Sequence, residues 1–137
     1  MVESPRGRKV IRARLGVVLA TGGIAWNKAL REKLLPKEAA PRSLAPETNT
    51  GDGVSVALKA GAVLDNGHDS PALWMPCSTM KHANGTQSVW PHIILDRAKP
   101  GLIAVSKSGN RFVNESDSYH DFCMGMIRAG LTEAWLI

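Results

Sequence analysis

The sequence is poor in cysteine and has no long hydrophobic run, and each absence excludes a class of protein. Cys77 and Cys123 are widely separated and form no CxxC pair, which argues against a structural zinc site and favours a reducing, cytoplasmic compartment. The longest apolar run, residues 15–20, has the length of a strand, whereas a membrane helix needs about 20 such residues. No apolar region of the length found in a signal peptide follows the basic N-terminus, so no secretory signal is expected. A length of 137 residues corresponds to one domain.

The motifs that mark common catalytic and metal sites are absent as well. No Walker loop, GxSxG elbow or HExxH motif occurs in the sequence. The histidines share no i,i+3 or i,i+4 spacing with one another, so no metal site is predicted. They are His68, His82, His92 and His120. Any function must therefore be sought in less common patterns.

The positive charge is concentrated at the N-terminus. The formal charge is +5, and the first 14 residues contribute +4 because five basic residues outnumber Glu3. The remaining 123 residues are therefore nearly neutral, at +1. A small binding module could use such a basic arm to contact nucleic acid or an acidic partner. No aromatic residue that could stack on a base lies in the arm, so a solvated segment leading into a strand is the simpler interpretation, and no nucleic-acid partner is expected.

Hydrophobic periodicity predicts a mixture of helices and strands. Residues 9–20 alternate and then become continuously apolar, which is typical of a buried parallel strand that ends at Thr21-Gly22-Gly23. Helical spacing predicts helices at 26–35, 51–62 and 119–128. Short strands are predicted at 93–95, 102–105, 111–113 and 134–137, with a hairpin turn at 108–110 and no regular pattern in 63–87.

Two glycine-containing segments have the composition of nucleotide-binding turns. In residues 16–23, GVVLATGG, an apolar strand leads into a small-residue turn whose backbone N–H groups can approach a dinucleotide; an ordinary structural turn is the alternative. In residues 48–53, TNTGDG, a helix start is combined with an acidic side chain, which suits a polyol or a ribityl chain. The alternative is that Thr50 or Asp52 merely caps the helix.

A third segment, residues 108–122, contains an unusual density of polar side chains. It includes Tyr119, and a tyrosine hydroxyl near cationic partners can donate a proton or act as a base. For any single member, such as His120, a structural role is the alternative. Outside this segment, Trp74 lies beside Pro76 in a glycine-rich stretch and is suited to lining an apolar substrate cleft.

Taken together and in this order, three strings resemble the FAD-dependent fumarate reductase/succinate dehydrogenase-like flavoproteins. They are LATGGIAWN at 19–27, NTGDGVSVALKAGA at 49–62, and PGLIAVSKSGNRFVNESDSYHDF at 100–122. The resemblance covers about residues 12–137. Trp74-Met75-Pro76, and the Asn114-Glu115 pair followed by Tyr-x-Asp-Phe, look most like the 3-ketosteroid 1-dehydrogenase-like branch.

The resemblance implies a role for particular residues. Tyr119 falls where a ketosteroid dehydrogenase-like enzyme keeps a tyrosine that helps remove hydrogen beside a carbonyl, and Arg97 lies near the catalytic arginine of the soluble fumarate reductases. A solvent-facing charge is the alternative for Arg97. The implied FAD-binding residues are Ala20, Thr21, Gly22, Gly23, Thr50, Gly51, Asp52 and Gly53.

Two departures from the family pattern narrow the expected function. The histidine-proline-threonine string of the soluble fumarate reductases is replaced by residues 75–79, MPCST, which disfavours a dicarboxylate and favours a small apolar ketone as substrate. The GxGxxG unit that binds the FAD pyrophosphate does not occur, nor does the family's C-terminal return segment. We therefore expect a fragment that binds FAD weakly or not at all when alone, although FAD serves the full-length parent.

The expected fold is α+β, the cap (substrate) domain of such a flavoprotein with a remnant strand of its nucleotide-binding domain. Residues 1–23 would be the basic lead-in and remnant strand, and residues 24–137 the truncated cap domain. The expected activity of the parent is oxidation of a CH–CH bond next to a carbonyl. A fumarate reductase-like fragment, the binding module described above and a decayed reading frame are the alternatives. Exposed sheet edges could also lead to self-association.

Overall fold

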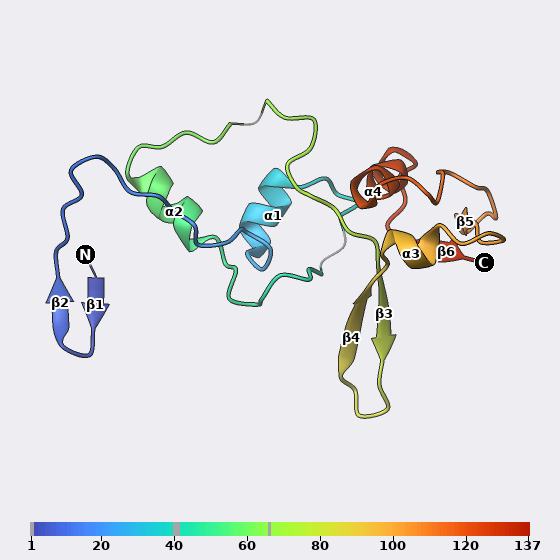
Figure 1. The fold of residues 1–137 in the computed structure, drawn as a ribbon, viewed down its shortest axis with the longest axis horizontal. Helices are drawn as coiled ribbons and strands as arrows, with labels where there is room; N and C mark the ends of the chain where they lie inside the picture. The colour runs from blue at the N-terminus through green and yellow to red at the C-terminus, as the bar shows by residue number, and fades with distance from the viewer. Residues whose placement is uncertain (1, 40–41, 66) are drawn as a thin grey trace.

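The structure is a computed structural model that describes residues 2–39, 42–65 and 67–137 (Figure 1). The described residues form four helices and six short strands. The helices are α1 (Lys28–Leu34), α2 (Asp52–Lys59), α3 (Ile94–Arg97) and α4 (Tyr119–Arg128). The strands are β1 (Val2–Ser4), β2 (Gly7–Lys9), β3 (Cys77–Lys81), β4 (Gln87–Pro91), β5 (Ala104–Val105) and β6 (Trp135–Leu136).

The strands pair in three separate antiparallel sheets of two strands each, in the order β1-β2, β3-β4 and β5-β6. The β3–β4 hairpin is the longest, with a register that runs from Cys77 opposite Pro91 to Lys81 opposite Gln87. In Figure 1 it projects from the part of the molecule that contains α3 and α4. The mixture of helices and antiparallel strands agrees with the α+β expectation.

Local sequence explains where α1 begins and where the three longer helices end. The Asn27 side chain caps α1 by accepting from the Leu30 N–H at 3.0 Å, and the residue before Pro36 leaves the helical conformation, as residues before proline tend to. The ends of α2 and α4 are closed by Gly61 and Gly130, whose φ angles are 89° and 67°. In both cases the next residue donates to a carbonyl five positions earlier, the pattern of a Schellman motif.

The core is small and lies in the C-terminal half. Ala104, Phe122 and Cys123 are its buried apolar residues, and Phe112 packs its ring edge against Phe122 with 5.8 Å between centroids. Partly buried apolar residues surround them: Trp74, Val113, Met126 and Leu136. This core joins α4 to the β5–β6 pair and to the segment before β3.

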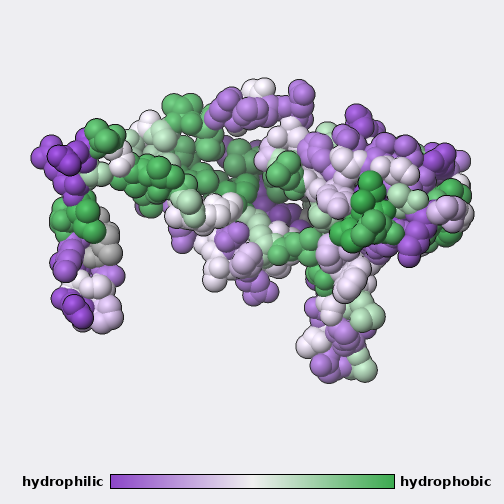
Figure 2. All heavy atoms as spheres, in the orientation of Figure 1, coloured by the Kyte–Doolittle hydropathy of each residue, from purple (hydrophilic) through white to green (hydrophobic). Residues whose placement is uncertain are grey.

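Much apolar surface remains exposed. The accessible surface is 10635 Å², whereas a compact monomer of this mass exposes about 6,900 Å². Figure 2 shows apolar atoms, in green, over the N-terminal half of the molecule. The exposed apolar side chains include Val10, Ile11, Leu15, Val17 and Val18.

The predicted parallel strand at 9–20 is wrong for the chain as it stands. Strand β2 ends at Lys9, and residues 10–20 run through no strand and are exposed. A strand needs a neighbour to complete its hydrogen bonds, and no described segment of this chain lies alongside to pair with it.

The prediction of a strand at 93–95 is also wrong, because Ile94–Arg97 forms the short helix α3. The strand predicted at 111–113 is reduced to an isolated antiparallel bridge between Arg111 and Val105. The predictions for α1, α2, α4, β5 and β6 are confirmed within a few residues at each end. The turn at 108–110 is confirmed by the Ser106–Asn110 and Gly109–Ser106 backbone hydrogen bonds. Two hairpins, β1–β2 and β3–β4, escaped prediction.

Candidate functional site

The two predicted nucleotide-binding segments lie against each other. A Cβ atom added to Gly22 would lie 2.6 Å from the side-chain oxygen of Asn49, and one added to Gly53 would overlap the hydroxyl of Thr21. The segments are therefore in van der Waals contact although about thirty residues of sequence separate them. Glycine at both positions leaves room for this contact, because a Cβ would displace the side chain of Asn49 or of Thr21.

Residues at the start of α1 hold the two segments together. The backbone N–H of Trp26 donates to the Asn49 carbonyl at 3.0 Å, and the side-chain amide of Asn27 donates to the Thr50 carbonyl at 2.8 Å. Because Asn27 also caps α1, one side chain fixes both the helix and the loop before α2. The sequence did not single out Asn27 for this role, although an asparagine just before a helical pattern is a recognisable capping signal.

The start of α2 differs from the simple capping alternative. Gly51, with a φ of 81°, occupies the N-cap position, and no side chain among the described residues caps the helix. Thr50 instead donates its hydroxyl to the Asp52 carboxylate at 3.0 Å. Gly51 and Gly53 are buried, whereas Asp52 is exposed in the first helical turn. The two glycines thus serve close packing, and the exposed groups beside them are Asp52 and the Ala20–Gly23 backbone.

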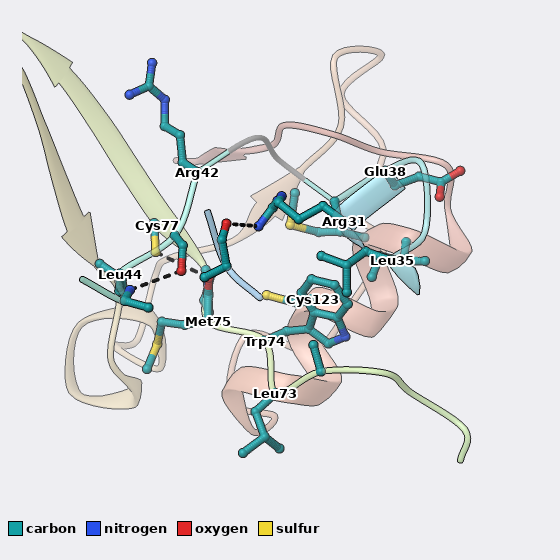
Figure 3. A pocket seen from close by; sticks show the side chains of 18 of the residues that line it. Arg31, Leu35, Glu38, Arg42, Leu44, Leu73, Trp74, Met75, Cys77 and Cys123 are labelled. Carbon is teal, nitrogen blue, oxygen red and sulfur yellow. Dashed lines mark hydrogen bonds between the residues drawn. The ribbon is translucent and has the colours of Figure 1, made fainter. Parts of the chain in front are cut away.

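An apolar cavity of about 600 Å³ opens next to Gly23 (Figure 3). Such a volume lies within the usual range for small-molecule sites. Its walls come from α1 and the loop after it, from the segment before β3, and from α4. Lining residues include Leu35, Leu44, Leu73, Trp74, Met75 and Cys123. The structure therefore places Trp74 in a cavity wall, as the sequence suggested.

Three charged side chains, Arg31, Glu38 and Arg42, lie in the cavity wall beside the apolar residues. Arg31 donates to the Ala25 carbonyl at 3.0 Å, and the Cys77 thiol contacts the Met75 carbonyl at 3.3 Å. Burial, together with the neighbouring Cys77, raises the pKa of the Cys123 thiol to about 12, so Cys123 is neutral at physiological pH. The cavity wall is therefore mainly apolar, with its charges on Arg31, Glu38 and Arg42.

Arg97 is fully buried, so the interpretation of a solvent-facing charge is wrong. Its guanidinium donates to three carbonyls, those of His92 at 3.2 Å, Glu115 at 2.6 Å and Asp117 at 3.0 Å. It also lies over the ring of Tyr119, 5.6 Å from the centroid. Arg97 thereby ties α3 to the polar segment that precedes α4.

Glu115 organises the same polar segment. Its carboxylate accepts from the Ala104 N–H at 2.7 Å and from two nitrogens of Arg111, at 3.1 and 2.6 Å. The hydrogen bonds from Arg111 are the main reason that the pKa of Glu115 is lowered to about 2. The polar density around Glu115 is visible in the sequence, but its place at the centre of this hydrogen-bond network is visible only in the fold.

Tyr119 is half-buried at the first turn of α4 and does not line the cavity. Cys123, Met126 and Ile127 of the same helix do line it. Tyr119 precedes Cys123 by four residues and so lies on the same helix face, one turn nearer the N-terminus. The predicted site residues thus fall into two groups, the glycine segments at one side of the cavity and the Arg97–Tyr119 pair beyond it.

Metal-ligand clusters and membrane-spanning helices are both absent from the described residues. Among the described ranges, no group of three or more histidine, cysteine or acidic side chains is arranged to hold a metal ion. Within the same ranges, no helix has the length and hydropathy required to cross a membrane.

Known proteins resemble this chain over most of its length. A 4-oxocyclohex-2-ene-1-carboxylate 5-dehydrogenase of Sinomonas cyclohexanicum is 40% identical over 121 residues, and the match covers 85% of this chain but 20% of that protein. A 3-oxosteroid 1-dehydrogenase of Mycobacterium tuberculosis is 38% identical over 122 residues, covering 86% of this chain and 20% of that one. The chain therefore spans about a fifth of the length of these relatives.

A solved structure is similar as well. The crystal structure of 3-ketosteroid delta1-dehydrogenase from Sterolibacterium denitrificans, in complex with 1,4-androstadiene-3,17-dione, aligns with a TM-score of 0.62 and 33% identity, covering 90% of this chain and 22% of that one. The sequence profile of the FAD binding domain family matches residues 1–134. The flavoprotein resemblance of the three sequence strings is thus confirmed, and the chain belongs to the FAD binding domain family.

Proposed function

We propose that this chain is the substrate-handling portion of an FAD-dependent oxidoreductase that oxidises a CH–CH bond next to the carbonyl of a small apolar ketone. The apolar cavity beside Gly23 is the observation that carries the proposal. It adjoins the glycine segments expected to approach FAD and has room for a drug-sized ligand. The relatives named above are dehydrogenases of oxo compounds, one of a cyclohexene carboxylate and one of a steroid, which supports a ketone as the substrate.

The residues of this chain fit part of an FAD molecule. The close contact of Gly22 with Asn49 and of Gly53 with Thr21 leaves the Ala20–Gly23 backbone exposed beside the start of α2. A helix start favours negatively charged or polyol groups. We assign Ala20, Thr21, Gly22, Gly23, Thr50 and Asp52 to the contact surface for FAD, and Gly51 and Gly53 to the packing beneath it.

In the proposed reaction, this chain positions the ketone and moves a proton. A C–H bond beside a ketone is acidic because its anion is an enolate, and bound FAD would accept hydride from the adjacent carbon. The Tyr119 hydroxyl is the proposed catalytic group that assists removal of the proton. Arg97 is the proposed positioning residue, because its guanidinium faces the Tyr119 ring while its donors bind carbonyls on either side. A catalytic role for Arg97 itself stays a prediction.

We further propose that residues 24–137 form the cap domain, and that residues 1–23 are a basic lead-in followed by a remnant strand of the nucleotide-binding domain, which would form only in the complete sheet. The exposed apolar side chains of residues 10–19 support this division, because a strand of a larger sheet would bury them.

Two unpaired cysteines support a cytoplasmic location. Since the sequence has no GxGxxG unit, the chain alone should bind FAD weakly or not at all. Purified protein that holds stoichiometric FAD would contradict this expectation.

A chimera tests the function directly. The stretch of the Sterolibacterium 3-ketosteroid dehydrogenase that matches this chain would be replaced by residues 1–137, and FAD content and turnover would be measured with a 3-ketosteroid and with fumarate. We expect bound FAD and oxidation of the ketosteroid. Tyr119→Phe should lower turnover about 100-fold and leave FAD content unchanged. A chimera that holds FAD but reduces fumarate, or a Tyr119→Phe variant with full turnover, would refute the assignment.

A further inference from the structure

A serine, a histidine and an aspartate form a hydrogen-bonded chain at the base of the β3–β4 hairpin. The Ser78 hydroxyl lies 2.6 Å from Nε2 of His92, and Nδ1 of His92 lies 3.0 Å from the Asp96 carboxylate. Both ring nitrogens of His92 are therefore engaged, one by the hydroxyl and the other by the carboxylate. This is the order of groups that activates a serine nucleophile in hydrolytic enzymes.

Three structural elements hold these groups in place. Ser78 lies in β3 opposite Trp90, and the His92 N–H continues the ladder by donating to the Pro76 carbonyl at 2.8 Å. The His92 carbonyl in turn accepts from the buried Arg97 at 3.2 Å. Asp96 follows His92 by four residues and lies within the single turn of α3. Hydrogen bonds thus hold the backbone of His92 at both its N–H and its carbonyl, which positions the imidazole.

Burial distinguishes the base from the nucleophile. The His92 side chain is 22% exposed, and Oδ1 of Asp96 is buried with no hydrogen-bond partner among the described residues. Ser78 is exposed. The Asp96 side chain as a whole is 36% exposed, so the imidazole is the better shielded of the two groups behind the accessible hydroxyl.

The surface around Ser78 is apolar and separate from the cavity described above. Trp90, directly opposite Ser78, is 67% exposed, and Met80, two residues along β3 and so on the same face, is 59% exposed. Cys77 and Thr79, on the opposite face, line the cavity instead. The hairpin therefore presents a second surface that can hold an aromatic or aliphatic group beside the Ser78 hydroxyl.

The register of the β3–β4 hairpin also orients a backbone N–H group, that of Thr79, as a hydrogen-bond donor beside Ser78. Hydrogen bonds join His92 to Pro76 and His82 to Thr86, so in this alternating ladder Ser78 and Trp90 form a hydrogen-bonded pair. Thr79 lies between such pairs, and its N–H points away from β4. The N–H of the residue after a nucleophilic serine is a common donor to the oxyanion of acyl transfer.

We propose that Ser78 is an acyl-accepting nucleophile for esters that carry an apolar or aromatic group. In the first step the Ser78 oxygen bonds to the ester carbonyl carbon and its proton passes to Nε2 of His92. The bond from that carbon to the leaving oxygen then breaks, and the leaving alcohol takes the proton from His92. Water attacks the acyl-serine by the same route and releases the carboxylic acid, so atoms and protons balance and no electron transfer is involved.

The same hairpin contains a matched control. His82 Nε2 and the Ser88 hydroxyl also form a hydrogen bond, but no carboxylate bonds to His82 in the described residues. If the carboxylate and the fixed imidazole matter, Ser78 should react and Ser88 should not. Both serines are exposed, so their alanine variants should fold alike.

The test is labelling of the whole chain with an alkyl fluorophosphonate, with the modified residue identified by peptide mass spectrometry. We expect adducts on Ser78, unaffected by Ser88→Ala, absent in Ser78→Ala, and about 100-fold slower in His92→Gln and Asp96→Asn. Hydrolysis of p-nitrophenyl butyrate should follow the same order. Equal labelling of Ser78 and Ser88, no labelling at all, or unchanged labelling in His92→Gln would overturn the proposal. The readout does not depend on FAD, so it is independent of the proposed oxidoreductase function.

Discussion

Replacing Glu115 by glutamine tests whether the polar segment before α4 is held by one buried carboxylate. The lowered pKa of Glu115, about 2, corresponds to at most about 3 kcal/mol of stability relative to an ordinary glutamate. Because the Arg111 side chain is 55% exposed, solvent screens part of this interaction, and we expect a contribution of about 1–2 kcal/mol. Glutamine can still accept from the Ala104 N–H, but it brings an amide donor towards the Arg111 guanidinium.

The sign of the pH dependence follows from the lowered pKa. A carboxylate whose folded-state pKa is depressed stabilises the fold above its ordinary pKa of about 4.3. This contribution is lost as pH falls from there towards about 2. Glu115→Gln should therefore lower the free energy of unfolding by about 1–2 kcal/mol at pH 7, and the difference from the wild type should shrink at pH 3.

Urea unfolding followed by tryptophan fluorescence, at a series of pH values between 7 and 3, measures this difference. The exposed Glu133→Gln variant is the control and should stay within about 0.5 kcal/mol of the wild type. A Glu115→Gln variant as stable as the control at pH 7 would refute the reasoning. So would a destabilisation that stays constant down to pH 3.

Three further substitutions have definite expected outcomes. Gly53→Ala should destabilise the fold by about 1–3 kcal/mol, since its methyl group would overlap the Thr21 hydroxyl, whereas Gly23→Ala, which meets no atom within 4 Å, should be neutral in the same urea titration. The free energy of unfolding should fall as pH rises from 9.0 towards 12, because burial keeps Cys123 protonated only in the folded state; Cys123→Ala should flatten this alkaline slope, and an unchanged slope would contradict the assignment.

Elements that local sequence determines were predicted well. Helices α2 and α4 end where Gly61 and Gly130 adopt positive φ angles, and glycine after an apolar helical pattern is a signal within a few residues of chain. The β3–β4 hairpin had a local signal too, Asn84-Gly85, but its strands lack the alternation of apolar and polar residues that usually identifies a hairpin.

Elements that depend on distant partners were predicted less well. Ile93-Ile94-Leu95 is a short apolar run that suits a strand or a helix equally, and Arg97, which binds carbonyls up to 20 residues away, lies in the helix that forms there. The glycine segments were recognised from their composition, but their mutual contact depends on Asn27 and Trp26, which only the fold brings to the loop before α2. Glu115 was one of many polar residues until its three hydrogen bonds were seen.

The exposed segment 10–20 also determines how the chain must be handled in solution. Its second half, from Leu15 to Leu19, is apolar and unpaired, which favours cross-chain strand pairing. Arg12 and Arg14 interrupt the first half and act as gatekeepers, because two copies that align there bring like charges together. Salt screens that repulsion. Light scattering should therefore show larger particles as the ionic strength rises, so dilute, low-salt buffer is the condition that limits association between chains.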